Sequence, residues 1–222
     1  MALDAKDGAA PVQWTLVIPL KPLERAKSRL TASTGDTLRP GLALAFAQDT
    51  VAAAVACAAV KDVVVVTDDG LAGRELTALG ARIVRDEPAG GLNAALAHGA
   101  AAVRAGRPET AVAALNADLP ALRPLELARV LDSAAYFPRS FLADTAGIGT
   151  TLLSAAPGSE LRPAFGVASR FRHSASGAVE LPLADVDSVR QDVDTGDDLR
   201  TALALGVGPR TAAAAARLLI AD

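Results

Sequence analysis

The stretch that decides the fold is Ala111-Val112-Ala113-Ala114-Leu115-Asn116-Ala117-Asp118-Leu119-Pro120, a short apolar run that ends in one carboxylate followed by proline. A continuous apolar run is typical of a strand that is buried on both faces, as in a parallel sheet. Because proline cannot continue a central strand, we expect Asp118 at the strand's carboxyl end. Ligands bind at that edge of an open α/β sheet. Asp118 is therefore a candidate for holding a magnesium ion against a phosphate, with capping of the helix after Pro120 as the alternative.

Strand and helix patterns alternate along the chain on the amino-terminal side of this stretch. The clearest strand is 62–67, because four consecutive valines fit a buried sheet and not a helix. This alternation predicts an α/β fold with a mostly parallel mixed sheet, right-handed crossovers and flanking helices. We predict strands at 14–20, 62–67, 81–85 and 111–118, a hairpin pair at 140–143 and 150–154, and helices at 40–58, 71–79, 91–105, 124–134, 196–205 and 211–220.

No repeat or low-complexity linker divides the chain, so we expect a flexible segment over 1–13 and one domain over 14–222. The first 13 residues lack an apolar signal core, and the apolar segment 42–60 is interrupted by Gln48 and Asp49. We therefore expect a cytoplasmic protein with no membrane span. The single cysteine, Cys57, excludes an intramolecular disulfide and argues against a cysteine-based zinc site.

The charge balance argues against a polymer-binding role. With 22 Lys and Arg against 25 Asp and Glu, the formal net charge is −3, so the chain lacks the basic excess that attracts nucleic acid. Aromatic residues make up only 3% of the chain, too few to suggest stacking platforms for single strands. We expect no nucleic-acid partner.

A basic loop follows the first predicted strand. Residues 21–30 contain the four cations Lys21, Arg25, Lys27 and Arg29. Cations at a strand end can neutralise a triphosphate, although most charge clusters are solvated turns. The glycine patterns of a P-loop and of a dinucleotide-binding loop are both missing.

A second candidate site is acidic. Asp192 and Asp194 alternate around Val193, so an extended backbone points both carboxylates to the same side. Carboxylates this close repel each other unless a cation lies between them, which favours metal binding. For Asp197 and Asp198 we favour helix capping, with Thr195 or Asp197 as the N-cap residue.

Small residues form a third candidate site at 147–151 and 165–169. Glycines let backbone amides approach an anion, and a helix that begins near Val167 adds a favourable dipole for phosphate. The alternative is ordinary turn chemistry. His173 follows Arg170 and Arg172 and is expected near a phosphate, although one histidine cannot form a zinc site.

Taken together, these segments resemble the family of phosphoenolpyruvate or 2-phospho-L-lactate guanylyltransferases, which act in the biosynthesis of coenzyme F(420), a deazaflavin hydride carrier. Each motif is short, but their joint order and spacing extend from Lys21 to Thr195. The resemblance implies a Rossmann-like nucleotidyltransferase (GT-A-like) fold, shared with nucleotide-sugar enzymes. The matching motifs are Lys21-x5-Lys27-Ser28-Arg29-Leu30, Gly91-Leu92-Asn93-x-Ala95-Leu96, Asn116-Ala117-Asp118-Leu119-Pro120, Asp144-x5-Thr150-Thr151-Leu152, Phe165-Gly166-x2-Ser169-x3-His173 and Asp192-x-Asp194-Thr195.

The resemblance also implies roles for individual residues. The phosphorylated three-carbon acid is assigned to Thr151, Gly166 and Ser169. The magnesium ligands are Asp118, Asp192 and Asp194. Nucleotide contacts are assigned to Lys21, Lys27, Arg29 and Asn93. The implied catalytic residues are Lys21, Lys27, Arg29 and Asp118. Ile148 lies in a loop that is usually small and polar, which leaves the role of Asp144 open.

The expected reaction is magnesium-assisted transfer of GMP from GTP to phosphoenolpyruvate, with release of pyrophosphate. The acceptors 2-phospho-L-lactate and 3-phosphoglycerate stay open, and we expect an unstable product that passes directly to the next enzyme. The rival enzymes are nucleotidyltransferases for a molybdenum cofactor or a sugar phosphate, whose first loop is glycine-rich. Residues 19–22 contain no glycine, which counts against them. A nucleotide-binding module without catalysis would not need three metal carboxylates.

Overall fold

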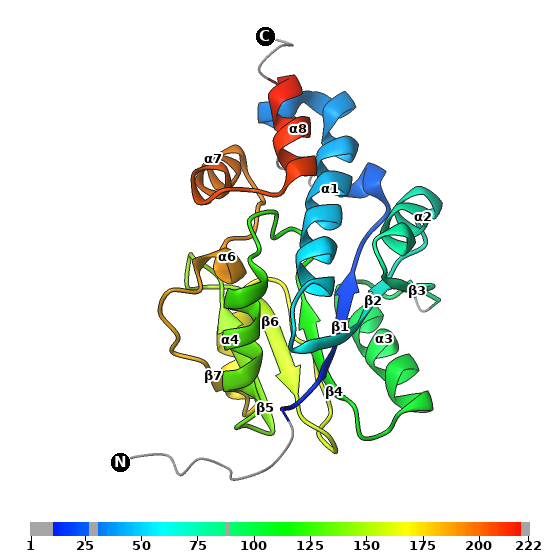
Figure 1. Ribbon diagram of the computed structural model, residues 1–222, viewed down its shortest axis with the longest axis vertical. Helices are drawn as coiled ribbons and strands as arrows, with labels where there is room; N and C mark the ends of the chain where they lie inside the picture. Colours follow the sequence, from blue (N-terminus) through cyan, green and yellow to red (C-terminus); the bar gives the residue numbers. More distant parts are fainter. Residues whose placement is uncertain (1–10, 27–30, 88, 219–222) are drawn as a thin grey trace.

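A seven-stranded mixed sheet forms the centre of the computed structural model, which describes residues 11–26, 31–87 and 89–218. The strand order is β3-β2-β1-β4-β6-β5-β7. Strand β6 runs antiparallel to β4 and β5, and the other neighbours in this sheet are parallel (Figure 1). The strands are β1 (Trp14–Pro19), β2 (Val60–Val66), β3 (Arg82–Val84), β4 (Ala111–Leu115), β5 (Arg139–Ala143), β6 (Thr150–Ala155) and β7 (Val179–Glu180).

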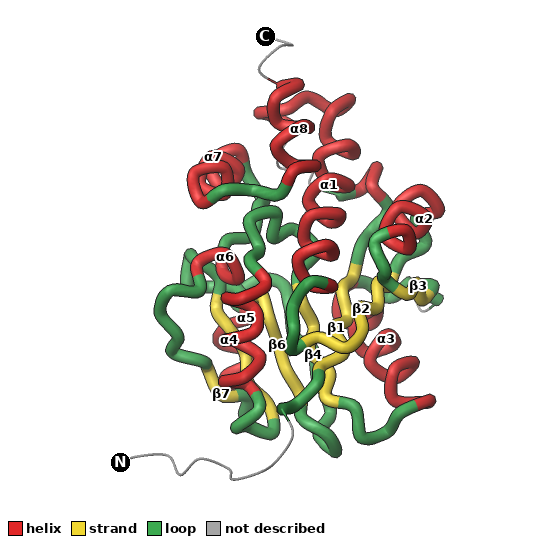
Figure 2. Tube along the Cα trace, viewed as in Figure 1, coloured by secondary structure: helices red, strands yellow, loops and turns green. Residues whose placement is uncertain are grey.

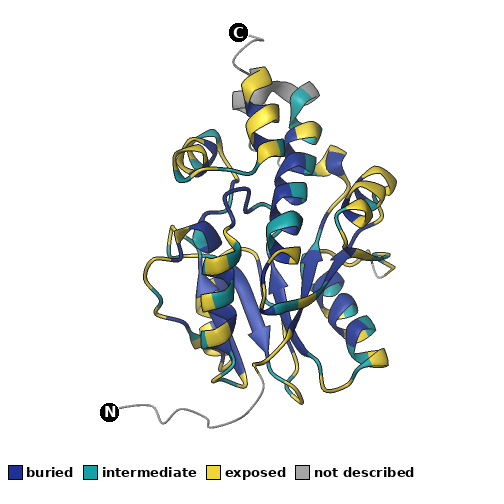
Figure 3. Ribbon diagram, in the orientation of Figure 1, coloured by how far each residue is buried: buried dark blue, intermediate teal, exposed yellow. Residues whose placement is uncertain are grey.

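Helices cover both faces of the sheet, so its central strands are buried (Figures 2 and 3). Within β2, Val63 and Val65 join the core under one layer, whereas Val64 and Val66 join the core under the other. The first layer contains α1 (Thr31–Val55), α2 (Gly70–Ala78), α4 (Pro124–Ala134) and α6 (Asp187–Arg190). The second layer contains α3 (Leu92–Gly106) and the segment with α5 (Ser169–Ala175). The remaining elements are the short helix η1 (Leu23–Arg25), α7 (Gly196–Leu205) and α8 (Pro209–Leu218), which lies along α1 (Figure 1).

The predicted α/β class, the mostly parallel sheet and the antiparallel pairing of β5 with β6 are confirmed. The predicted start of the first long helix is wrong: α1 begins at Thr31, so part of the expected loop is helical and Pro40 lies inside the helix. The helix packs along α8, and tertiary packing of this kind supplies most of the stability of helices in proteins. The division of the chain before Trp14 stays a prediction, because residues 1–10 lie outside the described part. None of the helices in the described residues has the length and hydropathy that a membrane span requires.

The end of β4 differs from the prediction. The strand ends at Leu115, three residues before Asp118, because the following backbone pairs with other elements. The amide of Leu119 donates to the Thr50 hydroxyl in α1, and the carbonyl of Asp118 accepts from Val193. The alternative role of Asp118 as a helix cap is wrong, since α4 begins only at Pro124.

Candidate active site

Several predicted site residues meet at one edge of the sheet. The carboxyl ends of β1, β4 and β5 lie there, together with the amino end of the antiparallel strand β6 (Figure 1). Lys21 follows β1, Asp118 follows β4 and Asp144 follows β5, while Thr150 and Thr151 begin β6. Segments that are far apart in the sequence therefore contribute to the same edge.

The acidic segment near residue 193 lies directly against Asp118. The backbone amide of Val193 donates to the carbonyl of Asp118 over 3.1 Å, and the amide nitrogen of the Asn116 side chain lies 3.5 Å from a carboxylate oxygen of Asp192. Val193 is fully buried, Asp192 is half-buried and Asp194 is exposed. This alternation turns both carboxylates away from the core, as an extended backbone requires.

The described residues contain no group of three or more His, Cys, Asp or Glu side chains placed to hold one metal ion. The protein alone does not form a three-carboxylate cage from Asp118, Asp192 and Asp194. Magnesium sites in nucleotide-dependent enzymes commonly use one or two carboxylates, with substrate phosphates and water as the remaining ligands. The donor chemistry of Asp118 and Asp192 fits such a site, and the metal assignment stays a prediction.

Of the two predicted N-cap residues, Thr195 and Asp197, it is Thr195 that caps α7, in a capping box with Asp198. The Thr195 hydroxyl accepts from the backbone amide of Asp198 over 3.3 Å, and the Asp198 carboxylate accepts from the amide of Thr195 over 2.8 Å. The same carboxylate accepts from the amide of Asp194 over 3.1 Å. The capping box therefore holds the backbone of the acidic segment in place.

The basic loop is described only at its beginning. Lys21 is exposed, whereas Lys27 and Arg29 lie outside the described residues. The backbone amide of Leu23 donates to the Asp69 carboxylate over 2.9 Å, and Asp69 also caps α2. Burial opposes ionisation of Asp69, but backbone amides and the charge of Arg74 outweigh it and lower its pKa. Sequence reasoning missed this anchor, for which the Asp69-Gly70 pair after a strand was the available signal.

The segment 161–176 carries two residues of the predicted acid-binding set. Gly166 has a φ of +109°, and its carbonyl accepts from the amide of Ser169 over 3.1 Å. A Cβ at Gly166 would lie 3.2 Å from a guanidinium nitrogen of Arg172, so both φ and space favour glycine. Ala168 adopts a left-handed conformation with a φ of +54°, and α5 begins at the buried Ser169. The tight turn thus sets the position of Ser169.

The third residue of that set, Thr151, is fully buried in β6. Its hydroxyl has no hydrogen-bond partner among the residues that the structure describes. A buried hydroxyl without a partner is costly, so this group is a candidate for contact with a ligand. Thr151 also supplies its backbone carbonyl to the amide of Asn116 over 3.0 Å.

His173 supports the 161–176 segment from inside the core, and its place near a phosphate stays a prediction. The ring is fully buried, and its Nε2 atom accepts from the amide of Ala164 over 3.0 Å. The proton therefore lies on Nδ1, which donates to the Thr150 hydroxyl over 3.0 Å. Burial, with the charges of Arg139 and Arg172, lowers the pKa of His173 from 6.5 to about 4. The imidazole is neutral at pH 7 and has no free nitrogen for catalysis.

Asp144 closes the loop between β5 and β6. Its two carboxylate oxygens accept from the amides of Ile148 and Gly149 over 3.0 and 2.8 Å. A Cβ at Gly149 would lie 2.3 Å from the same carboxylate, so this close approach requires glycine. The question that Ile148 raised about Asp144 thus has a structural answer, because its carboxylate holds the loop.

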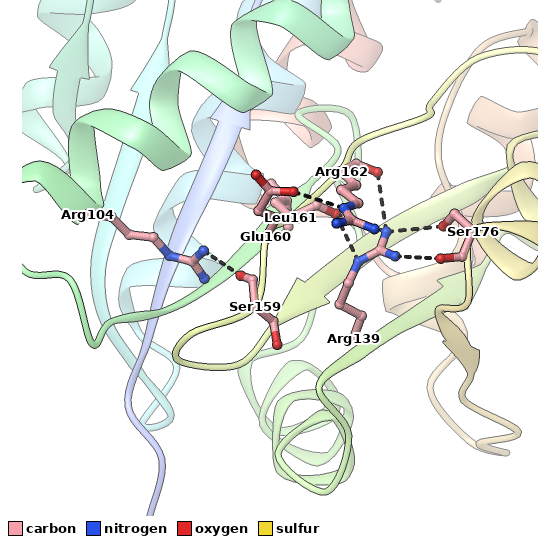
Figure 4. A network of polar contacts seen from close by, with 7 residues as sticks. All are labelled: Arg104, Arg139, Ser159, Glu160, Leu161, Arg162 and Ser176. Carbon is pink, nitrogen blue, oxygen red and sulfur yellow. Dashed lines mark hydrogen bonds and ion pairs between the residues drawn. The ribbon is translucent and has the colours of Figure 1, made fainter.

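Two arginines that sequence reasoning missed, the buried Arg139 and the half-buried Arg104, hold the ends of the neighbouring segments (Figure 4). Arg139 donates to the carbonyls of Leu161 and Ser176 over 3.1 and 3.0 Å, which joins both ends of the 161–176 segment. Arg104 donates from α3 to the carbonyl of Ser159. Burial lowers the pKa of both guanidinium groups. The sequence signal for Arg139 was a single arginine at the start of the short strand β5, whose last three residues are apolar.

An open depression of about 620 Å³ lies beside α2 and β3. It contains none of the predicted site residues. Its lining is Thr67, Asp68, Asp69, Gly70, Gly73, Arg74, Thr77, Ile83 and Arg85.

Comparison with known proteins links this fold and site to one family. A sequence model of the family described as "Guanylyl transferase CofC like" matches residues 14–216. Two proteins named phosphoenolpyruvate guanylyltransferase are similar over nearly the whole chain. The one from Streptomyces avermitilis is 78% identical over 209 residues, covering 94% of this chain and 97% of that protein. The one from Streptomyces coelicolor is 77% identical over 210 residues, covering 95% and 99%.

A solved structure, described as a putative nucleotide-diphospho-sugar transferase from Desulfovibrio desulfuricans, has the same fold. It superposes with a TM-score of 0.62 at 15% identity and covers 86% of each chain. At this identity the likeness concerns the fold alone. The Rossmann-like nucleotidyltransferase fold implied by the sequence motifs is confirmed.

Proposed function

Because this chain belongs to the family of CofC-like guanylyl transferases, we propose that it transfers GMP from GTP to phosphoenolpyruvate. A phosphate oxygen of phosphoenolpyruvate attacks the α-phosphorus of GTP, the bond from that phosphorus to the β-phosphate oxygen breaks, and pyrophosphate leaves. The product is enolpyruvyl-diphospho-guanosine. The acceptor phosphate has a second pKa of about 6 and is largely ionised at neutral pH, so the reaction needs no general base. The buried, neutral His173 is consistent with this scheme.

The single structural observation that carries the proposal is the 3.1 Å hydrogen bond between the Val193 amide and the Asp118 carbonyl. It places two acidic segments, 75 positions apart in numbering, side by side at the ligand-binding edge of the sheet. Asp118 and Asp192, with Asp194 beside them, would hold Mg²⁺ together with substrate phosphates, and the ion would screen the charge of one reactant from the other. Lys21, Lys27 and Arg29 are the proposed phosphate contacts.

We assign the phosphorylated acceptor to the side of this sheet edge that lies away from the proposed metal ligands. Thr151 offers a buried hydroxyl that has no protein partner among the described residues. Gly166 allows a tight turn beside Arg172, and its carbonyl accepts from the backbone amide of Ser169, which fixes where α5 begins. Thr151, Gly166 and Ser169 can donate hydrogen bonds to the phosphate of a small phosphorylated acid.

The acceptors 2-phospho-L-lactate and 3-phosphoglycerate fit the same residues, and the names of the two Streptomyces relatives favour phosphoenolpyruvate. We also propose that the product passes directly to the next enzyme, since a phosphoanhydride that carries an enol ester is reactive. The cytoplasmic location stays a prediction.

The test is pyrophosphate release and product mass with each of the four nucleoside triphosphates and each of the three acceptors. We expect release with GTP and phosphoenolpyruvate, dependent on added Mg²⁺. Preference for another acceptor would replace the acceptor assignment and leave the guanylyl transfer standing. Preference for another nucleotide would contradict the proposed reaction itself.

A further inference from the structure

We propose that Asn93 is a positioning residue that holds the 161–176 segment in the shape that binds the acceptor. The proposal rests on the proposed function, because it takes Gly166 and Ser169 as acceptor contacts. It assigns Asn93 to the acceptor side of the reaction, whereas the family resemblance suggests a nucleotide contact.

The geometry is a two-point hydrogen bond between one side chain and one backbone residue. The Asn93 Oδ1 atom accepts from the amide of Phe165 over 2.7 Å, and its Nδ2 atom donates to the carbonyl of Phe165 over 3.1 Å. The carboxamide thus pairs with both polar groups of Phe165, as a neighbouring strand would. An aspartate of the same shape keeps only the accepting half, and an alanine keeps neither.

Phe165 also contacts residues other than Asn93, and together these contacts hold its backbone and its ring in place. A guanidinium nitrogen of Arg172 donates to the same carbonyl over 3.1 Å. The Phe165 ring is 5% exposed and lies edge-on to the His173 ring, with 4.9 Å between their centres. The next residue is Gly166, whose carbonyl accepts from the amide of Ser169. A displacement of Phe165 would therefore move the acceptor contacts directly.

The side chain of Asn93 connects Phe165 to helix α3, which lies on the other half of the site. It lies in the first turn of α3, directly after the segment that leaves β3 at the ligand-binding edge. The bonded residues are 72 positions apart in sequence, so the bond joins two elements that the chain itself does not hold together. Asn93 thus links α3 to the turn that contains Gly166 and Ser169.

The decisive experiment is the isosteric variant Asn93→Asp, with Asn93→Gln as a second variant that keeps both hydrogen-bonding groups on a longer side chain. We expect Asn93→Asp to lower kcat/KM for phosphoenolpyruvate by about tenfold or more, while the KM for GTP changes by less than about twofold. Asn93→Gln should show the same pattern more weakly. The matched control is Gln48→Ala, which removes an amide that bonds Glu75 at an exposed position between α1 and α2.

A second readout does not depend on turnover or on the identity of the acceptor. Hydrogen–deuterium exchange at the Phe165 amide should be faster in Asn93→Ala, which removes both hydrogen bonds, than in the parent chain, and unchanged in Gln48→Ala. A raised KM for GTP with an unchanged KM for the acceptor would overturn the proposal and make Asn93 a nucleotide contact. Unchanged exchange at the Phe165 amide in Asn93→Ala would also overturn it. If the parent chain prefers another phosphorylated acid, the kinetic comparison is made with that acid.

Discussion

Acidification should destabilise this protein through His173 in particular. Its folded-state pKa is about 4, against 6.5 for the ordinary side chain, chiefly because the ring is buried and also because Arg139 and Arg172 are nearby. At a pH between these two values, His173 is protonated in the unfolded chain and neutral in the folded chain. The contribution of His173 to stability is therefore complete above about pH 6.5 and is lost as the pH falls toward 4.

The size of the loss follows from the two pKa values. At about pH 5, about 1.5 units below the unfolded value, the unfolded state gains about 2 kcal/mol relative to neutral pH. The folded state gains almost nothing there, because its own pKa lies lower still. A charged ring could not accept from the Ala164 amide, so protonation of the folded chain would also break the hydrogen bond that spans the turn.

The assay is urea unfolding at neutral pH and at about pH 5 for the parent chain and for His173→Gln, whose side-chain oxygen can still accept from Ala164 and does not titrate. The variant should be less stable at neutral pH but should lose about 2 kcal/mol less on acidification. The control His98→Gln retains His173 and should keep the parent's response to that group. Equal losses in the parent and in His173→Gln would refute the reasoning.

Three further substitutions test the site and its supports. Asp118→Asn should cost on the order of 3 kcal/mol in transition-state stabilisation and leave the fold intact. The control Asp197→Asn, on the exposed capping turn, should have the turnover rate of the parent chain. Parent-like rates for Asp118→Asn would contradict the assignment of Asp118 as a metal ligand. Ser169→Ala should weaken acceptor binding by about 2 kcal/mol and GTP binding much less, and a titration with the opposite result would place Ser169 on the nucleotide side. Arg139→Leu should lower the free energy of unfolding by about 3 kcal/mol or more, because it leaves buried carbonyls unsatisfied. The exposed Arg200→Ala should change the free energy of unfolding by less than about 1 kcal/mol, and a similar small effect for Arg139→Leu would contradict its anchoring role.

The family assignment shows how far motifs carry without a structure. None of the motifs is specific alone, yet their order from Lys21 to Thr195 identified the family that the comparison confirms. The roles of single residues were harder to predict. His173 belongs to a matching motif but faces the core, and Asn93 belongs to another but bonds the backbone of Phe165. A motif records that a residue is needed, not whether it contacts the substrate.

What the sequence determined by itself is the layered α/β sheet, the hairpin of β5 and β6, and a helix cap within residues 195–198. These depend on interactions within a few residues: β-branched runs that favour extended backbone, and a hydroxyl that bonds an amide three positions on. Only the tertiary structure decided that β4 ends before Asp118 and how far α1 extends. It also decided which buried arginine and histidine hold the 161–176 segment. Each of these depends on partners that lie far away in the sequence and come together only when the sheet and its two layers have packed.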